Sequence, residues 1–372
     1  MEMKNQVLIF IPYSADVTHG GPAGFAAQNL AGHVLQHAVL TPNRPTYSSL
    51  SQKLWRGGRQ LIGLLSIPPV YRWEYTQSRF AFKHAKVSEY KFVYFHDMYN
   101  LFFCRDLLRE SQTVILQPHM PELLHEEEIT FGKTDPEFIR WVKHEVTPAV
   151  FGRANFVVMP NPGALAIYKS VIAESSKIIY LLSGARQPSH VTTVPFDPQY
   201  VYLLFIGRRD PIKGFDLLLE AFKRAYLRRP ELRLVLIGSG KTETPGIIDL
   251  GYSQRPHDWI ASVDWVINCN RQSYLDLSVL ETLANGTPLL MTCTWGHEVF
   301  KNASPGIIDF GDSSVDNIEQ ALLKIGRKIE LGPEAMERNR ELYQKSFSDA
   351  VYRKKLDETL GYLVNDNSNS KC

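Results

Sequence analysis

Short apolar runs alternate with amphipathic stretches along most of the chain, an alternation that is typical of parallel sheets covered by helices. We predict two such arrays of strands. The first comprises Val7–Ile11, Phe92–Phe95, Val114–Gln117 and Phe156–Met159, and the second comprises Tyr202–Ile206, Leu232–Ile237, Trp265–Asn268, Leu289–Thr292 and Gly306–Asp309. The expected fold class is therefore α/β.

A polar segment with two prolines, Arg186–Pro195, separates the two arrays and is typical of a linker. With 372 residues, the chain is long enough for two domains. We expect the first at residues 1–190 and the second at residues 196–346. The polar tail at residues 365–372 is expected to be disordered.

Charge and cysteine content exclude several classes of protein. Lys and Arg number 41 against 39 Asp and Glu, so no nucleic-acid partner is indicated. Four cysteines without paired spacing predict neither a disulfide framework nor a zinc site, and favour a reducing compartment. The first apolar run, Val7–Pro12, is too short for a signal peptide or a spanning helix, so a cytoplasmic protein is expected.

The segment Gly207–Gly214 connects a buried strand to an amphipathic helix and carries two cations. Arg208 can donate two hydrogen bonds to phosphate oxygens, Lys213 adds a point charge, and the amides of the following helix add partial positive charge. This arrangement suits a diphosphate. The alternative is a pair of solvated surface cations that pair with Asp210 or Asp216.

Glu281 lies in the first turn of a short predicted helix that ends at Gly286 and Pro288. A carboxylate held there can accept hydrogen bonds from two ribose hydroxyls. The alternative is a capping box, in which Ser278 caps the helix and Glu281 accepts from the cap amide.

Gly20 and Gly21 follow the first predicted strand and would let a ligand approach the backbone closely, unless they only form a tight turn. His96 and His119 each follow a buried strand, at the edge where open sheets bind ligands. The acidic run His125–Glu128 has no second metal ligand at helical spacing and is interpreted as a solvated helix face.

Two further patterns narrow the chemistry. The sequence contains no Asp-x-Asp, so a carboxylate pair that holds a metal against a diphosphate is not predicted. The segment Gly238–Thr242 ends like a nucleoside-triphosphate loop, but Val235 stands where that loop requires its first glycine, so an ATPase is not indicated.

Together these motifs resemble the retaining glycosyltransferases of the GT-B fold, specifically the large family 4 that uses nucleotide-sugar donors. Gly207-Arg208 with Lys213-Gly214 is similar to that family's diphosphate motif, and Glu281–Pro288 is similar to its Glu-Ala-Met-Ala-x-Gly-x-Pro segment. The resemblance covers nearly the full length. It also includes Gly20-Gly21, His119, Gly238–Gly240, Asp264 and a closing helix at Phe347–Leu360.

The resemblance implies two doubly wound, Rossmann-like domains that face each other across a cleft, with a helix at about residues 347–364 crossing back to the first domain. It implies sugar transfer with retention from a nucleoside-diphosphate sugar, without metal, cofactor or a protein base. Arg208, Lys213 and His119 would be catalytic, with His119 contacting the sugar. The donor would also contact Gly20, Gly21, Gly207, Tyr252, Ser273, Asp276, Leu277, Ser278 and Glu281.

One departure concerns the donor sugar. The first of the family's two glutamates falls at Ser273, and Tyr274–Asp276 replaces a Gly-Phe-Gly loop. Asp276 either supplies the missing carboxylate or is a turn residue. The alternative function is a catalytically silent GT-B protein that binds a nucleotide sugar or a glycan.

The acceptor is expected to be a glycan or a lipid-linked molecule, in surface polysaccharide or glycoconjugate assembly. Residues 51–92 carry eight Lys and Arg against two Glu, interleaved with aromatic residues. This composition favours a peripheral protein that contacts an anionic membrane at its inner face. The alternative is an ordinary helix surface with core aromatics.

Overall fold

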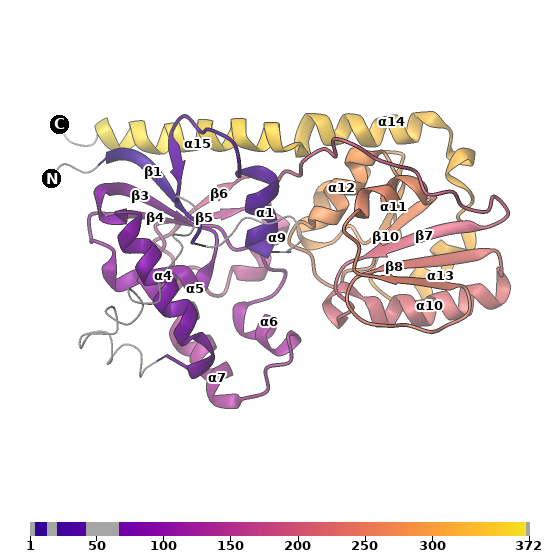
Figure 1. Ribbon diagram of the computed structural model, residues 1–372, viewed down its shortest axis with the longest axis horizontal. Coiled ribbons are helices and arrows are strands. Elements are labelled where there is room, and N and C mark those ends of the chain that lie inside the picture. The colour runs from indigo at the N-terminus through magenta and orange to yellow at the C-terminus, as the bar shows by residue number, and fades with distance from the viewer. Residues whose placement is uncertain (1–3, 13–20, 42–66, 370–372) are drawn as a thin grey trace.

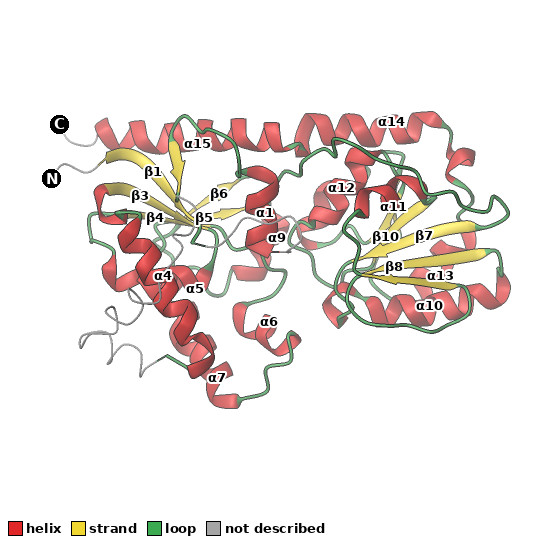
Figure 2. Ribbon diagram, viewed as in Figure 1, coloured by secondary structure: helices red, strands yellow, loops and turns green. Residues whose placement is uncertain are grey.

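The computed structural model describes residues 4–12, 21–41 and 67–369, which form two α/β domains side by side (Figure 1). Each domain has one six-stranded sheet, and all the strand pairs are parallel. Helices flank both sheets, as Figure 2 shows. The α/β class and the two doubly wound units are thereby confirmed.

The first sheet has the order β2-β1-β3-β4-β5-β6. Its strands are β1 (Lys4–Phe10), β2 (Ala38–Leu40), β3 (Tyr90–Phe95), β4 (Thr113–Leu116), β5 (Phe156–Met159) and β6 (Lys177–Tyr180). The main helices of this domain are α1 (Gly21–Asn29), α4 (Arg72–His84), α5 (Met98–Cys104), α6 (Leu124–Thr130), α7 (Pro136–Trp141), α8 (Thr147–Arg153) and α9 (Pro162–Tyr168). The strand order reverses between β1 and β3, which makes this the switch point where such sheets bind ligands.

The second sheet has the order β12-β11-β10-β7-β8-β9. Its strands are β7 (Val201–Ile206), β8 (Leu232–Ile237), β9 (Ile247–Gly251), β10 (Trp265–Asn268), β11 (Leu289–Met291) and β12 (Ile307–Asp309). Its helices include α10 (Phe215–Arg228), α11 (Pro256–Ser262), α12 (Leu277–Asn285) and α13 (Val315–Lys324). Here the order reverses between β7 and β10.

Residue periodicity explains how these elements pack. On α10, Leu218, Ala221, Phe222 and Ala225 are buried at helical spacing on one face. Along β7, alternate residues belong to the hydrophobic clusters on opposite sides of the sheet, so the strand is buried on both faces. The predicted strands all appear, whereas β2, β6 and β9 are not predicted from the sequence.

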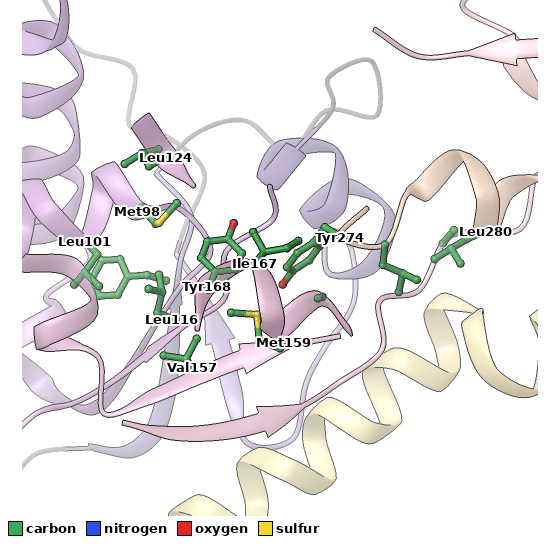
Figure 3. Packing of buried hydrophobic residues seen from close by; sticks show 14 of the residues in the cluster. Met98, Leu101, Leu116, Leu124, Val157, Met159, Ile167, Tyr168, Tyr274 and Leu280 are labelled. Atoms are coloured by element: carbon green, nitrogen blue, oxygen red, sulfur yellow. The ribbon is translucent and has the colours of Figure 1, made fainter. Parts of the chain in front are cut away.

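The two domains meet where α9 packs against the 3₁₀ segment Trp295–Phe300. The buried Asn161 Nδ2 donates to the Gly296 carbonyl at 2.8 Å. Tyr274 of the second domain is buried near Tyr168 of the first, with ring centroids 6.5 Å apart (Figure 3). One hydrophobic cluster therefore continues across the junction.

A nearly continuous helical run closes the structure and lies along both domains (Figure 1). It consists of α14 (Pro333–Leu342), a π-helical turn at Tyr343–Phe347, and α15 (Asp349–Asn369). Leu356 and Leu360 of α15 join the hydrophobic cluster around β1 and α1. Residues 365–369, where the predicted disordered tail begins, continue α15 as its last residues. Disorder of the tail stays a prediction.

Replacing Gly163 by alanine should destabilise the domain junction. A Cβ at this position would overlap the carbonyl group of Trp295 across the junction. We expect Gly163→Ala to lower the free energy of unfolding by about 1–3 kcal/mol, measured by chemical denaturation. Gly152→Ala on α8, where the new methyl group meets no atom within 4 Å, is the matched control and should leave stability unchanged or slightly higher. Equal stabilities for the two variants would contradict the close approach.

Candidate active site

A cavity of about 900 Å³ lies between the domains, at the carboxyl ends of both sets of parallel strands. The first domain lines it with the start of α1, the loops after β3 and β4, and α6. The second domain lines it with the loop after β7 and the start of α12. The cavity therefore joins the switch points of the two sheets.

Arg208 lines the cavity in the loop after β7. Its Nε lies 3.0 Å from Asp210 Oδ2, and its guanidinium group lies over the Phe131 ring at 4.6 Å. The predicted alternative of an ion pair with Asp210 is therefore present. Among the described residues, neither terminal nitrogen makes a hydrogen bond, so both can still donate to a ligand in the cavity.

Lys213 also lines the cavity, and its Nζ donates to Asp276 Oδ2 at 2.7 Å. Asn268 and Asn270 donate to the same oxygen, at 3.2 and 2.9 Å. Burial alone would raise the pKa of Asp276, but the charge of Lys213 and these hydrogen bonds outweigh burial and hold the pKa well below its usual range. Asp276 is therefore a cavity carboxylate that fixes the Lys213 ammonium group.

The backbone beside Lys213 explains the Lys-Gly pair in the sequence. The Asp210 carboxylate accepts a hydrogen bond from the Lys213 amide at 3.2 Å and begins a short 3₁₀ turn. Gly214 then takes a φ of 66°, with its α-carbon so close to the Cys269 carbonyl group that a side chain would overlap it. Only glycine fits both conditions.

Glu281 does not form the predicted capping box. The helix α12 begins at Leu277, one residue before Ser278, and no side chain caps it. Ser278 thus lies inside the first turn, and the Glu281 carboxylate instead accepts a hydrogen bond from Gln28 Nε2 of the first domain at 2.6 Å. Burial raises the pKa of Glu281 to about 7. This carboxylate lines the cavity and holds the domains together at the same time.

His119 and His96 form a neutral pair at the ends of β4 and β3. His96 Nδ1 lies 2.9 Å from His119 Nε2, and the Phe25 ring packs against His119 at 4.4 Å. Burial lowers the pKa of His96 to about 3 and holds that of His119 well below its usual value. Both histidines line the cavity without positive charge, so they can exchange hydrogen bonds with hydroxyl groups.

The remaining predicted site residues divide into three groups. Gly21, which starts α1 with a φ of 62°, lines the cavity together with Gly207, Leu277 and Ser278. Tyr252 is exposed away from the cavity wall, and Ser273 is fully buried outside it. Gly20 lies outside the described residues.

The acidic run on α6 is not the solvated face that the sequence predicts. Glu127 and Glu128 both line the cavity, and Glu128 is buried. Two hydroxyl groups, from Tyr71 and Tyr99, donate to Glu128 Oε1 at 2.6 Å each. The sequence does contain an indication that Glu128 points inward: Glu128 lies four residues after the apolar Leu124, and residues at this spacing share one face of a helix.

Glu127 has fewer hydrogen-bond partners than the other described carboxylates of the cavity wall. Its side chain is 12% exposed, and its Oε1 lies 3.7 Å from Arg208 Nη1, beyond hydrogen-bonding distance. Burial raises the pKa of Glu127 to about 7, although the charge of Arg208 partly offsets this effect. Within the described ranges, no cluster of three or more His, Cys, Asp or Glu side chains is arranged to hold a metal ion.

The basic and aromatic segment at residues 51–92 is only partly described, because residues 51–66 fall outside the described ranges. In the remainder, Arg79 is buried and pairs with Asp106, whereas Trp73 is exposed. No helix in the described part of the chain is both long and apolar enough to cross a bilayer. Contact with a membrane surface therefore stays a prediction.

This architecture is similar to that of known proteins. Residues 200–327 match the family described as "Glycosyl transferases group 1". Anabaena Alr3699/HepE in complex with UDP-glucose is similar over 96% of this chain and 99% of that chain, at 12% identity and a TM-score of 0.66. The chain has the GT-B fold of glycosyltransferases.

Two other GT-B structures extend the comparison. Sucrose-phosphate synthase from Thermosynechococcus elongatus is 15% identical, with a TM-score of 0.69 over 97% of this chain and all of that one. The pneumococcal O-GlcNAc transferase GtfA in complex with UDP and GlcNAc is 15% identical, with a TM-score of 0.56 over 78% of this chain and 60% of that one. No curated protein sequence matches the chain.

The family match covers the wall that holds Arg208, Lys213, Asp276 and Glu281. The first domain, which supplies Glu127, Glu128 and the two histidines, lies outside the matched residues. The GT-B architecture is therefore shared across the chain, whereas the family signal is confined to one side of the cavity.

Replacing Glu281 by glutamine should stabilise the protein at alkaline pH. In the folded state the pKa of Glu281 is about 7, above its ordinary value of 4.5, so ionisation is harder in the folded than in the unfolded chain. Stability is therefore lost as the pH rises from about 4.5 through 7. The uncharged amide avoids this loss and still offers an oxygen to Gln28. We expect a gain of about 1–3 kcal/mol at pH 8 that disappears by about pH 4.5.

The measurement is chemical denaturation at several pH values, with Glu174→Gln as the control because Glu174 is exposed. A gain that is independent of pH, or one shared by the control, would show that burial does not shift the titration of Glu281.

Proposed function

We propose that this protein transfers a sugar from a nucleoside-diphosphate sugar to a hydroxyl group of a glycan or lipid-linked acceptor, with retention of anomeric configuration and without a metal ion. The observation that carries the proposal is the cavity wall on which Arg208, Lys213 and Glu281 stand together at the switch point of a GT-B domain. The group 1 family match to this domain and the UDP-glucose complex of HepE support it.

The cations would bind the diphosphate and stabilise it as the leaving group. Negative charge builds up on the diphosphate as the bond to the sugar breaks, and fixed donors stabilise this charge without reorganisation. Arg208 offers both terminal nitrogens, and Lys213 retains two ammonium protons beyond the one given to Asp276. Gly21 at the start of α1 lines the same cavity, and its amide would add a third donor.

Glu281 and His119 would orient the rest of the donor. Ribose hydroxyls can donate to Glu281, while a neutral His119 suits a sugar hydroxyl better than a phosphate. Asp276 supplies a negative charge in place of the family glutamate that is absent at Ser273. Because its carboxylate accepts a hydrogen bond from Lys213, we assign Asp276 to positioning the Lys213 ammonium group. Tyr252 stays our prediction for the surroundings of the base.

The acceptor hydroxyl would attack from the face that the diphosphate leaves, and its proton would pass to a departing phosphate oxygen. This route gives retention and needs no protein base. The predicted setting is the assembly of surface polysaccharide or glycoconjugate at the cytoplasmic face of a membrane.

Binding of one nucleoside diphosphate is the first expected result. We would titrate UDP, GDP, dTDP, ADP and CMP by calorimetry into the protein and into Lys213→Ala. One diphosphate should bind selectively, with a loss of about 10- to 100-fold in the variant, equivalent to about 1.4–2.7 kcal/mol. Lys223→Ala, on the exposed side of α10, is the matched control. If none of the five binds, the proposed donor site is wrong.

Transfer should then be independent of metal and should retain configuration. With the sugar donors of the selected nucleotide, product formation should be the same in excess EDTA, and NMR of the first product should show the anomeric configuration of the donor. Loss of activity in EDTA, or an inverted product, would contradict the mechanism.

A catalytically silent GT-B protein is the second candidate, favoured by Ser273, which lies buried outside the cavity wall at the position of a family glutamate. It would bind a nucleoside diphosphate, yet neither transfer nor hydrolyse any donor sugar. Product analysis with the selected donors distinguishes it from an enzyme.

A further inference from the structure

We propose that the acceptor is an uncharged sugar, whose hydroxyl groups donate to Glu127 and Glu128 in the half of the cavity that the first domain supplies. The same carboxylates would exclude a phosphate or carboxylate near the reacting hydroxyl. The inference rests on the proposed function, since it concerns the second substrate of the same cavity.

Glu128 is built as a fixed hydrogen-bond acceptor. The hydroxyl groups of Tyr71 and Tyr99 both donate to its Oε1 at 2.6 Å, and the two tyrosine rings stack with centroids 4.6 Å apart. Among the described residues, nothing donates to Glu128 Oε2. A carboxylate with one oxygen fixed and the other open to donors is preorganised for a hydroxyl group.

Aromatic side chains pack against Tyr71 and Tyr99, and another aromatic side chain lines the cavity. Phe138 lies parallel to Tyr71, and Trp141 to Tyr99, with centroids 5.6 and 6.5 Å apart. Phe131 is 57% exposed and lines the cavity beside Arg208. This half of the cavity therefore combines aromatic surface with oriented acceptors, which suits the apolar faces and polar rim of a sugar ring.

Glu127 provides the second acceptor. It is enclosed, lines the cavity, and accepts no hydrogen bond from the described residues. An enclosed carboxylate without donors costs free energy, and such costs are concentrated at functional sites where a ligand supplies the missing partners. Because Glu127 lies 3.7 Å from Arg208, a hydroxyl bound there would be close to the diphosphate.

The charges in this half disfavour an anion. Among the described residues, the first domain contributes the carboxyl groups of Asp97, Glu127 and Glu128 to the cavity wall, against one base, Lys133, and the two histidines, whose pKa values burial lowers. Arg208 and Lys213 stand on the other wall, where the donor diphosphate would engage them. An acceptor anion would then face carboxylates and diphosphate together, in a partly enclosed site that screens charge less than bulk water does.

The test is saturation-transfer difference NMR on the full chain, in the presence of the diphosphate that calorimetry selects. The neutral probes are the methyl α-glycosides of glucose, galactose and mannose. The charged probes are the anions glucose 6-phosphate and glucuronic acid. At least one neutral glycoside should bind, at least tenfold more tightly than any charged probe.

Three variants separate this proposal from a purely structural role of α6. Glu128→Gln should weaken binding of the neutral glycoside at least fivefold, and Glu127→Gln should raise the affinity for glucose 6-phosphate relative to the neutral sugar. Glu126→Gln is the matched control on the same helix, because the Glu126 carboxylate accepts from the Leu123 amide and does not line the cavity. Retained diphosphate binding shows that Glu128→Gln is folded.

Preference for an anionic sugar, absence of binding by every neutral glycoside, or equal effects of Glu128→Gln and Glu126→Gln would each overturn the proposal. These outcomes can be distinguished from a failure of the proposed function. A protein that binds a nucleoside diphosphate but prefers an anionic sugar refutes only the acceptor. A protein that binds neutral sugars but no diphosphate refutes the donor site instead.

Discussion

The packing of α9 against the segment Trp295–Phe300 sets the relation between the two sheets, and the rest of the cavity depends on it. Gly163 allows backbone contact there, and Asn161 converts that contact into a buried hydrogen bond. With the junction closed on this side, the two switch points face each other, and Gln28 can reach Glu281. A GT-B site needs both walls at the correct separation, and a backbone contact defines that separation more rigidly than side chains alone.

The cavity wall of the second domain carries both cations and carboxylates, whereas the described wall of the first domain carries mainly carboxyl groups. On the second domain, Arg208 and Lys213 are each held by an aspartate, which limits their mutual repulsion while leaving donors open to a ligand. On the first domain, two tyrosine hydroxyl groups hold Glu128, and Glu127 lies largely enclosed near Arg208. Charges fixed before a substrate arrives do not have to reorganise during the reaction, which is where an enzyme of this kind would gain rate.

Much of the fold could be predicted from the sequence because central parallel strands are buried on both faces and appear as apolar runs. The strands β2, β6 and β9 were missed because each lies at the edge of its sheet and is only partly buried. The apolar stretches in these strands, such as Ala38–Leu40 and Ile178-Ile179, are short and are not distinguished from loop residues by sequence alone. Their existence follows from pairing with a neighbour, which is a tertiary property.

In the site, as in the fold, residues that nearby sequence places could be predicted, whereas partners far away in the sequence could not. Arg208 and Lys213 were predictable because one strand-to-helix loop places both of them. Glu281 was predicted as a cavity carboxylate, but its partner Gln28 is 253 residues away, so local spacing suggested a capping box instead. The sequence predicts a solvent face for Glu127 and Glu128, because acidic residues on a short helix are usually exposed. Only the tyrosines from elsewhere in the domain reverse that interpretation for Glu128.

The closing helix has a consequence for how the chain is made. Tyr352, Leu356, Leu360 and Leu363 of α15 complete the hydrophobic cluster over β1 and α1, so the last part of the chain fills a core that the first part begins. During synthesis, the amino-terminal domain has an open apolar face until residues 352–363 emerge from the ribosome, after the whole second domain. The first domain is therefore completed only after the second domain has been made, and its apolar face stays open to aggregation until then.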